Sequence, residues 1–162
     1  MNIFVLDENP DTAAQMMCDK HVVKMILETA QMMCTVVASY GHDTPYRPTH
    51  ARHPCTLWAG QSRSNWGWLV DHGMSLCEEY TKRYGKIHKS QRIIEWCART
   101  HIDLPETPRT PFAQAMPPQY RNECAVTAYR AYYQGEKAPI ATWKTEQPYW
   151  WTSATEGEEN GL

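Results

Sequence analysis

Three ionisable side chains on one predicted helix face are the strongest indication of chemistry in this sequence. His21 and Glu28 are seven residues apart, so at about 100° per residue they point in nearly the same direction, and Lys24 lies within about 60° of both. Apolar residues surround them, and charged groups on a buried stripe are costly unless they pair. Enzymes use such groups for proton transfer. We therefore predict a catalytic site here, the alternative being a structural Lys24–Glu28 pair beside a core imidazole.

Lysines in the same stretch could also act as nucleophiles or bind phosphates. Lys20 and Lys24 are four residues apart, and a lysine that is desolvated beside another cation loses its proton more easily. The bland interpretation is that both side chains are solvated on the helix surface. Which interpretation holds depends on how the helix packs.

Two histidines follow in the loop 44–54, which contains three prolines. His50 and His53 could join Asp19 or Glu28 around a metal ion, but the spacing completes no zinc motif, and we predict no metal and no other cofactor. We expect the two histidines to contact substrate instead.

The next predicted helix carries further candidates for substrate binding, Trp58, Arg63 and Asn65. An indole can stack on a base, and a guanidinium or an amide can contact a phosphate or a base edge. The same residue types are also common on an ordinary surface helix. Their spacing does not separate the two interpretations.

The elements that must position these residues are mostly helical. We expect a short extended segment at 2–6 and helices at about 11–40, 56–84, 90–100 and 123–133. Five prolines over 102–120 exclude a continuous helix there and indicate a chain wrapped over the helical body. The expected fold is all-α: a compact bundle of three to four helices forming a single domain over 1–151, followed by a flexible acidic tail at 152–162.

Composition limits the class of protein. The net charge is −2, of which the three glutamates of the tail contribute −3, so the body is slightly basic. Six cysteines without a CxxC pair, no signal peptide and no apolar run near 18 residues favour a cytoplasmic protein that spans no membrane. Seven Trp and nine Tyr against two Phe suit either a core with polar edges or a cleft that binds bases. The oligomeric state is left open.

The chain resembles the pyrimidine-dimer DNA glycosylase family, the phage endonuclease V type, in three places. An extended N-terminal segment comes first, then Asp19-Lys20-His21-Val22-Val23 with Glu28 nine residues after Asp19. An aromatic and lysine stretch, Thr142-Trp143-Lys144, lies near the end. The opening residues are also similar to those of small proteins of tailed phages, which would place the protein in the host cytoplasm.

The resemblance implies a small all-α enzyme that acts on double-stranded DNA. In that family the α-amino group of the first residue, here Met1, attacks the sugar carbon of the damaged nucleotide to form an imine, and the glutamate, here Glu28, assists. His21 would be the histidine that contacts DNA. The family has arginines around its glutamate where this chain has Leu27 and Gln31, so phosphate contacts would come from lysines or from Arg63.

Three hypotheses about function follow. The leading one is a glycosylase and lyase that binds an extruded damaged or modified pyrimidine nucleotide and works at its glycosidic carbon. The second is a phage transferase that modifies an activated thymine derivative in DNA. The third is a non-enzymatic phage protein that binds a nucleotide or a host defence protein, in which His21 and Glu28 would be a structural pair.

Overall fold

This computed structural model describes residues 1–153 of the chain, which contain six α-helices and one 3₁₀ helix. The helices are α1 (Pro10–Met16), α2 (Asp19–Ala38), α3 (Pro54–Ala59), α4 (Arg63–Tyr84), α5 (Gln91–Arg99), η1 (Pro118–Tyr120) and α6 (Ala125–Glu136). That part of the chain contains no strand, which confirms the all-α prediction. The predicted number of helices was too low, because two of the predicted helices are each divided in two.

The first division separates α1 from α2 at Met17 and Cys18, whose backbones are extended. No glycine or proline marks this break. The Cys18 N–H donates to the hydroxyl of Tyr133, and the Asp19 N–H donates to the carbonyl of Thr142. These donors at the start of a helix have no partner within it, so distant residues satisfy them and fix where α2 begins.

The second division separates α3 from α4 at residues 60–62. Ser62 is an N-cap whose hydroxyl accepts the Asn65 N–H at 3.0 Å. A serine cap of this kind stabilises a helix start by about 1 kcal/mol, which favours a new helix over continuation of α3. α4 then ends at Gly85, which has a φ of +70° and closes the helix in the left-handed conformation that glycine favours.

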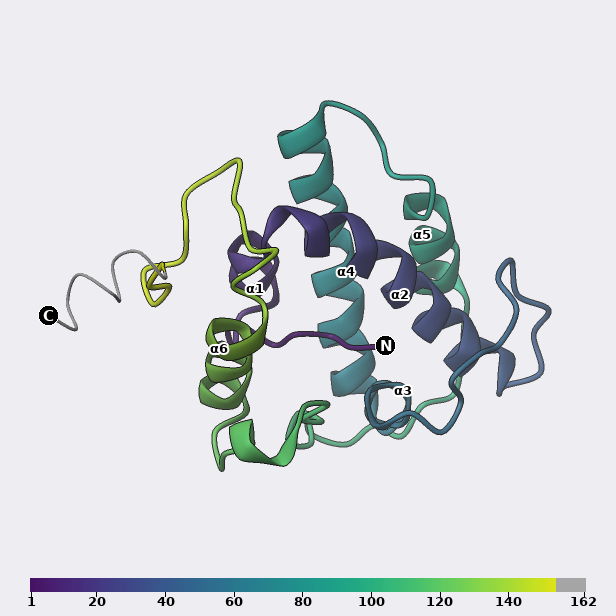
Figure 1. The fold of residues 1–162 in the computed structure, drawn as a ribbon. Helices are drawn as coiled ribbons and strands as arrows, with labels where there is room; N and C mark the ends of the chain where they lie inside the picture. The colour runs from purple at the N-terminus through teal and green to yellow at the C-terminus, as the bar shows by residue number, and fades with distance from the viewer. Residues whose placement is uncertain (154–162) are drawn as a thin grey trace, which may run out of the picture.

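The helices pack around α2 and α4, which lie against each other at the centre of the molecule (Figure 1). α1 packs on α4, α5 packs on both central helices, and α3 joins them near the end of α2. The chain runs from Pro105 to Pro111 along the outside of α3 and α4, where the Arg63 N–H donates to Pro105 and the Trp58 indole donates to Thr110. The predicted proline-rich wrap is therefore present.

The N-terminal segment begins between α2 and α3 and runs from there through the middle of this arrangement (Figure 1). Ile3 to Leu6 are buried, and α6 covers them from the other side, with the Arg130 guanidinium donating to the Leu6 carbonyl at 2.9 Å. Phe4 has a φ of +56°, which is uncommon for a residue with a side chain and bends the segment locally. The first residue is consequently held inside the fold rather than at its edge.

The segment after α6 returns along α1. The Trp143 indole donates to the Met16 carbonyl at 2.9 Å, and Trp151 is buried against Tyr133. Of the predicted acidic tail, Thr152 pairs through its backbone with the Gln134 amide; residues 154–162 lie outside the described part. The single-domain boundary at 151 stays a prediction.

Candidate active site around Glu28

The Glu28 carboxylate meets the amino terminus of the chain. Oε1 lies 3.2 Å from the Met1 amino nitrogen and accepts the Asn2 N–H at 3.1 Å, while Oε2 lies 3.9 Å from Lys24 Nζ. The Glu28 side chain is 11% exposed and that of Lys24 is 71% exposed. One carboxylate oxygen is therefore committed to the N-terminus, and the other faces a cation that can move away.

The amino group is held in place by Asn2. Its side-chain amide donates to the Ala115 carbonyl at 2.7 Å, and its Oδ1 accepts the N–H groups of Ile3 and Phe4 at 2.8 and 3.2 Å. Asn2 thus makes a tight turn that anchors the first residues to the segment before α6. A primary amine and a carboxylate in fixed contact form a preorganised pair in which the carboxylate can take the proton of the amine.

His21 is buried and packs against the N-terminal segment. Its Nδ1 is 2.6 Å from the Tyr133 hydroxyl, and its ring stacks on Phe4 with 4.4 Å between the centroids. Burial, followed by the positive charges of Lys137 and Lys24, lowers the pKa of His21 to about 4. The neutral imidazole is therefore favoured at pH 7, and the described contacts of His21 are with Tyr133 and Phe4.

The loop between α2 and α3 brings His50 and His53 toward the same place. Thr35 fixes this loop to α2, since its hydroxyl donates to the Thr49 carbonyl at 2.9 Å and accepts the Thr49 N–H at 3.0 Å. The next residue, His50, has a φ of +51°, a strained backbone of the kind that clusters at functional sites. Burial, the charge of the N-terminal amino group and His50 lower the pKa of His53, and Glu28 raises it. His53 therefore lies within electrostatic range of both members of the Met1–Glu28 pair.

Four lysines lie along α2 or beside the N-terminal segment, and the sequence pointed to three of them. Lys20 and Lys24 lie exposed on the outer face of α2. The Lys144 ammonium lies 5.4 Å from the centre of the Tyr84 ring. The fourth, Lys137, lies 5.0 Å from the Tyr132 ring and 5.7 Å from the Phe4 ring, and its charge acts on His21. Sequence reasoning missed it because it follows α6, far along the chain from the catalytic stretch.

A buried ion cluster at the start of α2 was also missed. The Arg83 guanidinium is fully buried and donates to Glu79 at 2.9 Å, to Asp19 at 3.2 Å, and to the carbonyls of Met17 and Gln15. Asp19 Oδ1 in turn accepts the Lys144 N–H at 3.0 Å. This cluster ties α4 to the start of α2 and sets the place of Lys144.

The structure places Trp58, Arg63 and Asn65 in structural roles. Trp58 is 2% exposed, and Asn65 is fully buried with its amide shared between the Trp58 carbonyl and Thr110. Arg63 donates to the Ile102 carbonyl and pairs with Glu106. Within residues 1–153 none of these contacts reaches Glu28 or the amino terminus. These three residues hold the proline-rich wrap on α3 and α4.

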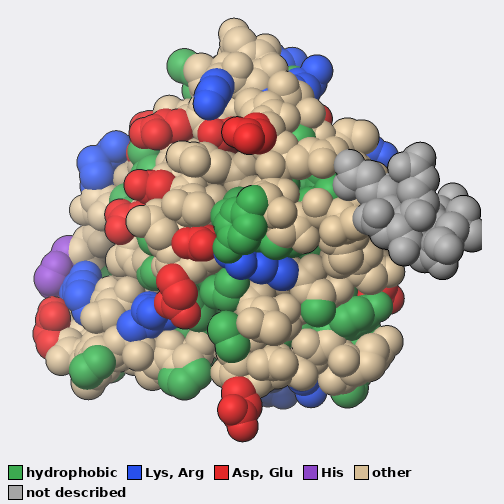
Figure 2. Space-filling model, turned by 90° about the vertical axis from the view of Figure 1, so that its left-hand side faces the viewer, with side chains coloured by type: hydrophobic (Ala, Val, Ile, Leu, Met, Phe, Trp, Pro, Cys, Tyr) green, Lys and Arg blue, Asp and Glu red, His purple; other side chains and the backbone are tan. Residues whose placement is uncertain are grey.

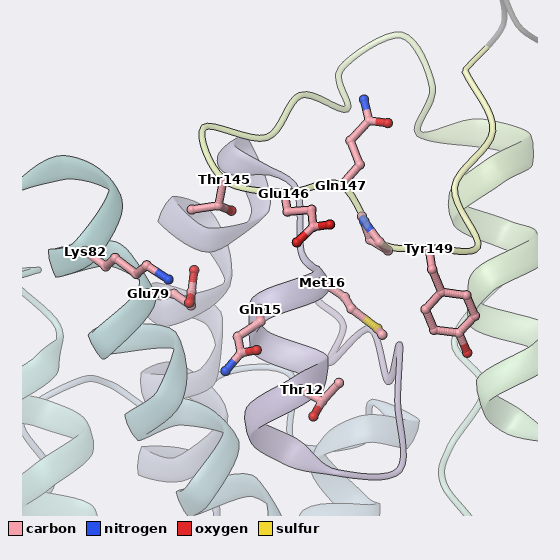
Figure 3. Close-up of a pocket in the computed structure, with 10 residues that line it drawn as sticks. Thr12, Gln15, Met16, Glu79, Lys82, Thr145, Glu146, Gln147 and Tyr149 are labelled. Atoms are coloured by element: carbon pink, nitrogen blue, oxygen red, sulfur yellow. The ribbon is translucent and has the colours of Figure 1, made fainter.

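Two hollows in the described part of the chain can be compared as places where a ligand could bind. One of about 420 Å³ lies next to the site along α2, where Leu27 and Gln31 face Tyr46, Arg47 and the two residues after them. Another, of about 360 Å³, lies between α1, α4 and the segment 145–149 (Figure 3). It contains Glu79, Glu146 and Lys82, and both acidic and basic side chains are spread over that side of the molecule (Figure 2). The second hollow has neither the amine nor the histidines of the Glu28 site.

Two further findings concern ligands and membranes. Within residues 1–153 no three His, Cys, Asp or Glu side chains are gathered so that they could hold a metal ion. None of the helices described is long and apolar enough to cross a bilayer.

A family model described as pyrimidine dimer DNA glycosylase matches residues 1–92, more than half of the chain. No curated protein and no solved structure matches. The matched region contains the amino terminus, α2 with Glu28, the loop histidines and α4. Lys137 and Lys144 lie outside it.

Proposed function

The chain belongs to the pyrimidine dimer DNA glycosylase family, and from that premise we propose that it uses its terminal amine and Glu28 to attack the glycosidic carbon of a damaged pyrimidine in duplex DNA. Membership makes it a DNA repair glycosylase in general and DNA its substrate. It also confirms the resemblance found in the sequence. The observation that carries the mechanistic proposal is the 3.2 Å contact between the Met1 nitrogen and Glu28 Oε1.

The amine has the position that a nucleophile needs. It is fixed by Asn2, and its neighbour Oε1 can accept its proton when the nitrogen attacks C1′ of the sugar. The bond from C1′ to the pyrimidine nitrogen breaks with its electron pair leaving on the base. Loss of the proton from nitrogen and opening of the sugar ring then give an imine between chain and DNA.

Glu28 acts a second time after the imine forms. With one proton taken from the amine, it can protonate the ring oxygen as the sugar opens, and the regenerated carboxylate can then remove a proton from C2′. Elimination of the 3′ phosphate would follow, giving a strand break. Lys24, which is exposed beside Oε2, is suited to pair with a phosphate near the reacting sugar rather than to act as the nucleophile.

DNA would lie across the outer face of α2. Lys20 and Lys24 lie on that face beside Val23 and Leu27, which are 38% and 41% exposed, and the exposed part of the helix has no acidic side chain. Lys137 and Lys144 flank it. Positive groups around an apolar strip fit a duplex whose phosphates contact the rim and whose opened bases contact the strip.

Borohydride trapping tests the proposal directly. Wild-type chain is incubated with borohydride and a duplex carrying either a cyclobutane thymine dimer or a preformed abasic site, and the adduct is digested and located by mass spectrometry. We expect the adduct on the N-terminal peptide. The Asn2 nitrogen lies as close to Glu28 Oε1 as the Met1 nitrogen does, so the mass of that peptide also shows which residue is first in the active chain.

The controls separate nucleophile from fold. Addition of one residue before Met1 should abolish trapping while the melting temperature changes little, and Glu78→Gln, an exposed glutamate on α4, should trap like wild type. An adduct on Lys24 would show that the nucleophile is a side chain. Absence of any adduct from wild-type chain on both duplexes would overturn the mechanism.

A further inference from the structure

His53 has a fixed tautomer because of its place in the fold. It is the N-cap of α3, and its Nδ1 accepts the Cys55 N–H at 3.1 Å. A ring nitrogen that accepts a hydrogen bond carries a lone pair, so in the neutral imidazole the single proton is on Nε2. The cap therefore makes the outer nitrogen of His53 a donor.

The ring lies within electrostatic range of both members of the Met1–Glu28 pair. The charges of the Met1 amino group and of Glu28 both act on it, and it is only partly buried. The thiol of Cys55 contacts the Ile3 backbone, so the start of α3 packs directly on the N-terminal segment. Figure 1 shows that segment ending beside α3. The start of α3, which carries His53, and the amino terminus therefore lie on neighbouring elements.

The surroundings also favour the neutral form of the ring. Burial lowers the pKa of His53, and so do the N-terminal amino group and His50. A neutral imidazole in this state is unsuited to be a general base, because Nε2 already carries a proton and Nδ1 is occupied by the helix cap. What remains is hydrogen-bond donation from Nε2, a role that neutral histidines perform at carbonyl oxygens in other enzymes.

We propose that His53 donates a hydrogen bond from Nε2 to the carbonyl oxygen of the leaving pyrimidine as its bond to C1′ breaks. The inference rests on the proposed function, in which the amine supplies the new bond to C1′. The electron pair of the broken bond enters the pyrimidine ring, and its negative charge appears largely on the carbonyl oxygen. His53 stabilises that charge without giving up its proton, and the base takes its proton from solvent. One proton is lost from the amine and one is gained by the base.

This role separates two substrates. A duplex with a thymine dimer has a base that must leave, whereas a duplex with a preformed abasic site has none. Removal of one preorganised donor at a developing oxyanion costs about 10²- to 10³-fold in rate. The cost should therefore fall on the first substrate alone.

The experiment compares His53→Ser with wild type on both duplexes under single-turnover conditions, with borohydride trapping as the readout. Serine is a good N-cap, so α3 keeps its capping bond while the donor is lost. We expect base release from the dimer duplex to fall about 10²- to 10³-fold, and trapping at the abasic duplex to stay within about threefold of wild type. His53→Asn, which also caps well, decides the matter should the serine variant unfold, and His101→Ser, on an 81% exposed side chain, is the matched control.

The outcomes are distinct. Equal loss on both duplexes shows that His53 only maintains the site and overturns the inference, as does unchanged base release. Wild-type chain that is inactive on the dimer duplex overturns the proposed function itself.

Discussion

Asp19 and Glu28 are two carboxylates on the same helix, nine residues apart, and their surroundings are opposite in kind. Asp19 accepts from Arg83 and from the Lys144 N–H, and Arg83, fully buried, spends its remaining donors on Glu79 and two carbonyls. Glu28 is equally buried but meets the chain terminus and a lysine that is mostly in water. Asp19 therefore belongs to a closed cluster, meaning that its charged partner is fully buried and fixed, whereas Lys24 can move away from Glu28 into solvent.

The contrast shows which ionic groups hold the fold and which are free for chemistry. A buried charge whose every partner is fixed cannot exchange a proton or a ligand without breaking the packing around it. A carboxylate with one committed oxygen and one loosely paired oxygen can do both. In the proposed mechanism the same helix therefore serves as a scaffold at its start and as a catalytic surface two and a half turns later.

Glu28→Gln should produce the largest effect on activity. The amide keeps an acceptor for the Asn2 N–H but cannot take a proton from the amine, so strand cleavage and trapping should fall by about 10³-fold. The free energy of unfolding should fall by about 1 to 3 kcal/mol, because the Met1 amino group, which is 2% exposed, loses its counter-ion. Single-turnover assays with chemical denaturation measure the two quantities. A large loss of stability with activity retained would reverse the assignment.

Asp19→Asn makes the same chemical change at the closed cluster and should have the opposite result. One charge balancing the buried Arg83 is lost, which should lower the free energy of unfolding by about 3 kcal/mol. The catalytic rate of the chain that remains folded should stay within about threefold of wild type, since Glu28 keeps its contacts. Urea unfolding and an active-site titration by borohydride trapping test this. A stable but inactive variant would place Asp19 in the chemistry.

The sequence pointed to the groups around Glu28 but not to the ion cluster at Asp19, for a physical reason. Helical periodicity puts His21 and Glu28 on one face wherever α2 begins, and the resemblance added the terminal amine. Arg83 is 64 residues from Asp19, and nothing local in either stretch signals their pairing. The same holds for Lys137, which reaches the site only because α6 packs on the N-terminal segment.

Trp58 and Asn65 were predicted from local sequence as substrate contacts, but both are buried in the structure. On a surface helix both could face DNA, but the segment around Thr110 covers them and takes up their hydrogen bonds. The prolines predicted that this segment wraps the body, yet they do not say which residues it covers. The helix breaks at Cys18 and Gly60 were missed likewise, because contacts or caps outweigh propensity there.

Acid should lower the free energy of unfolding, because a buried histidine lies on α2 between the two clusters. His21 lies between them on α2, and burial lowers its pKa to about 4 from 6.5. The unfolded chain therefore binds the proton first, so stability is complete above about pH 6.5 and falls as the pH drops toward 4, by on the order of 3 kcal/mol. His72, fully buried with a pKa also near 4, acts in the same direction.

Urea unfolding at several pH values tests this dependence. His21→Gln should remove about half of the decline between pH 6.5 and 4, and His42→Gln, on an exposed loop histidine, should leave it unchanged. A decline as steep in the His21 variant as in wild type would assign the effect to other groups.

The smallest predicted effect is on the salt dependence of DNA affinity, and it distinguishes the outer face of α2 from the side around α1. Lys24→Ala and Lys144→Ala should each lower the slope of log affinity against log salt by about 1, with little change in preference among sequences, because each lysine would release counterions from one phosphate. Lys82→Ala, in the hollow that Glu79 and Glu146 also line (Figure 3), should leave the slope unchanged. Fluorescence anisotropy with an undamaged duplex at several salt concentrations gives the slopes. An equal decrease for Lys82 would mean that DNA also contacts the side around α1, so that the closed cluster at Asp19 would lie beneath a binding surface of its own.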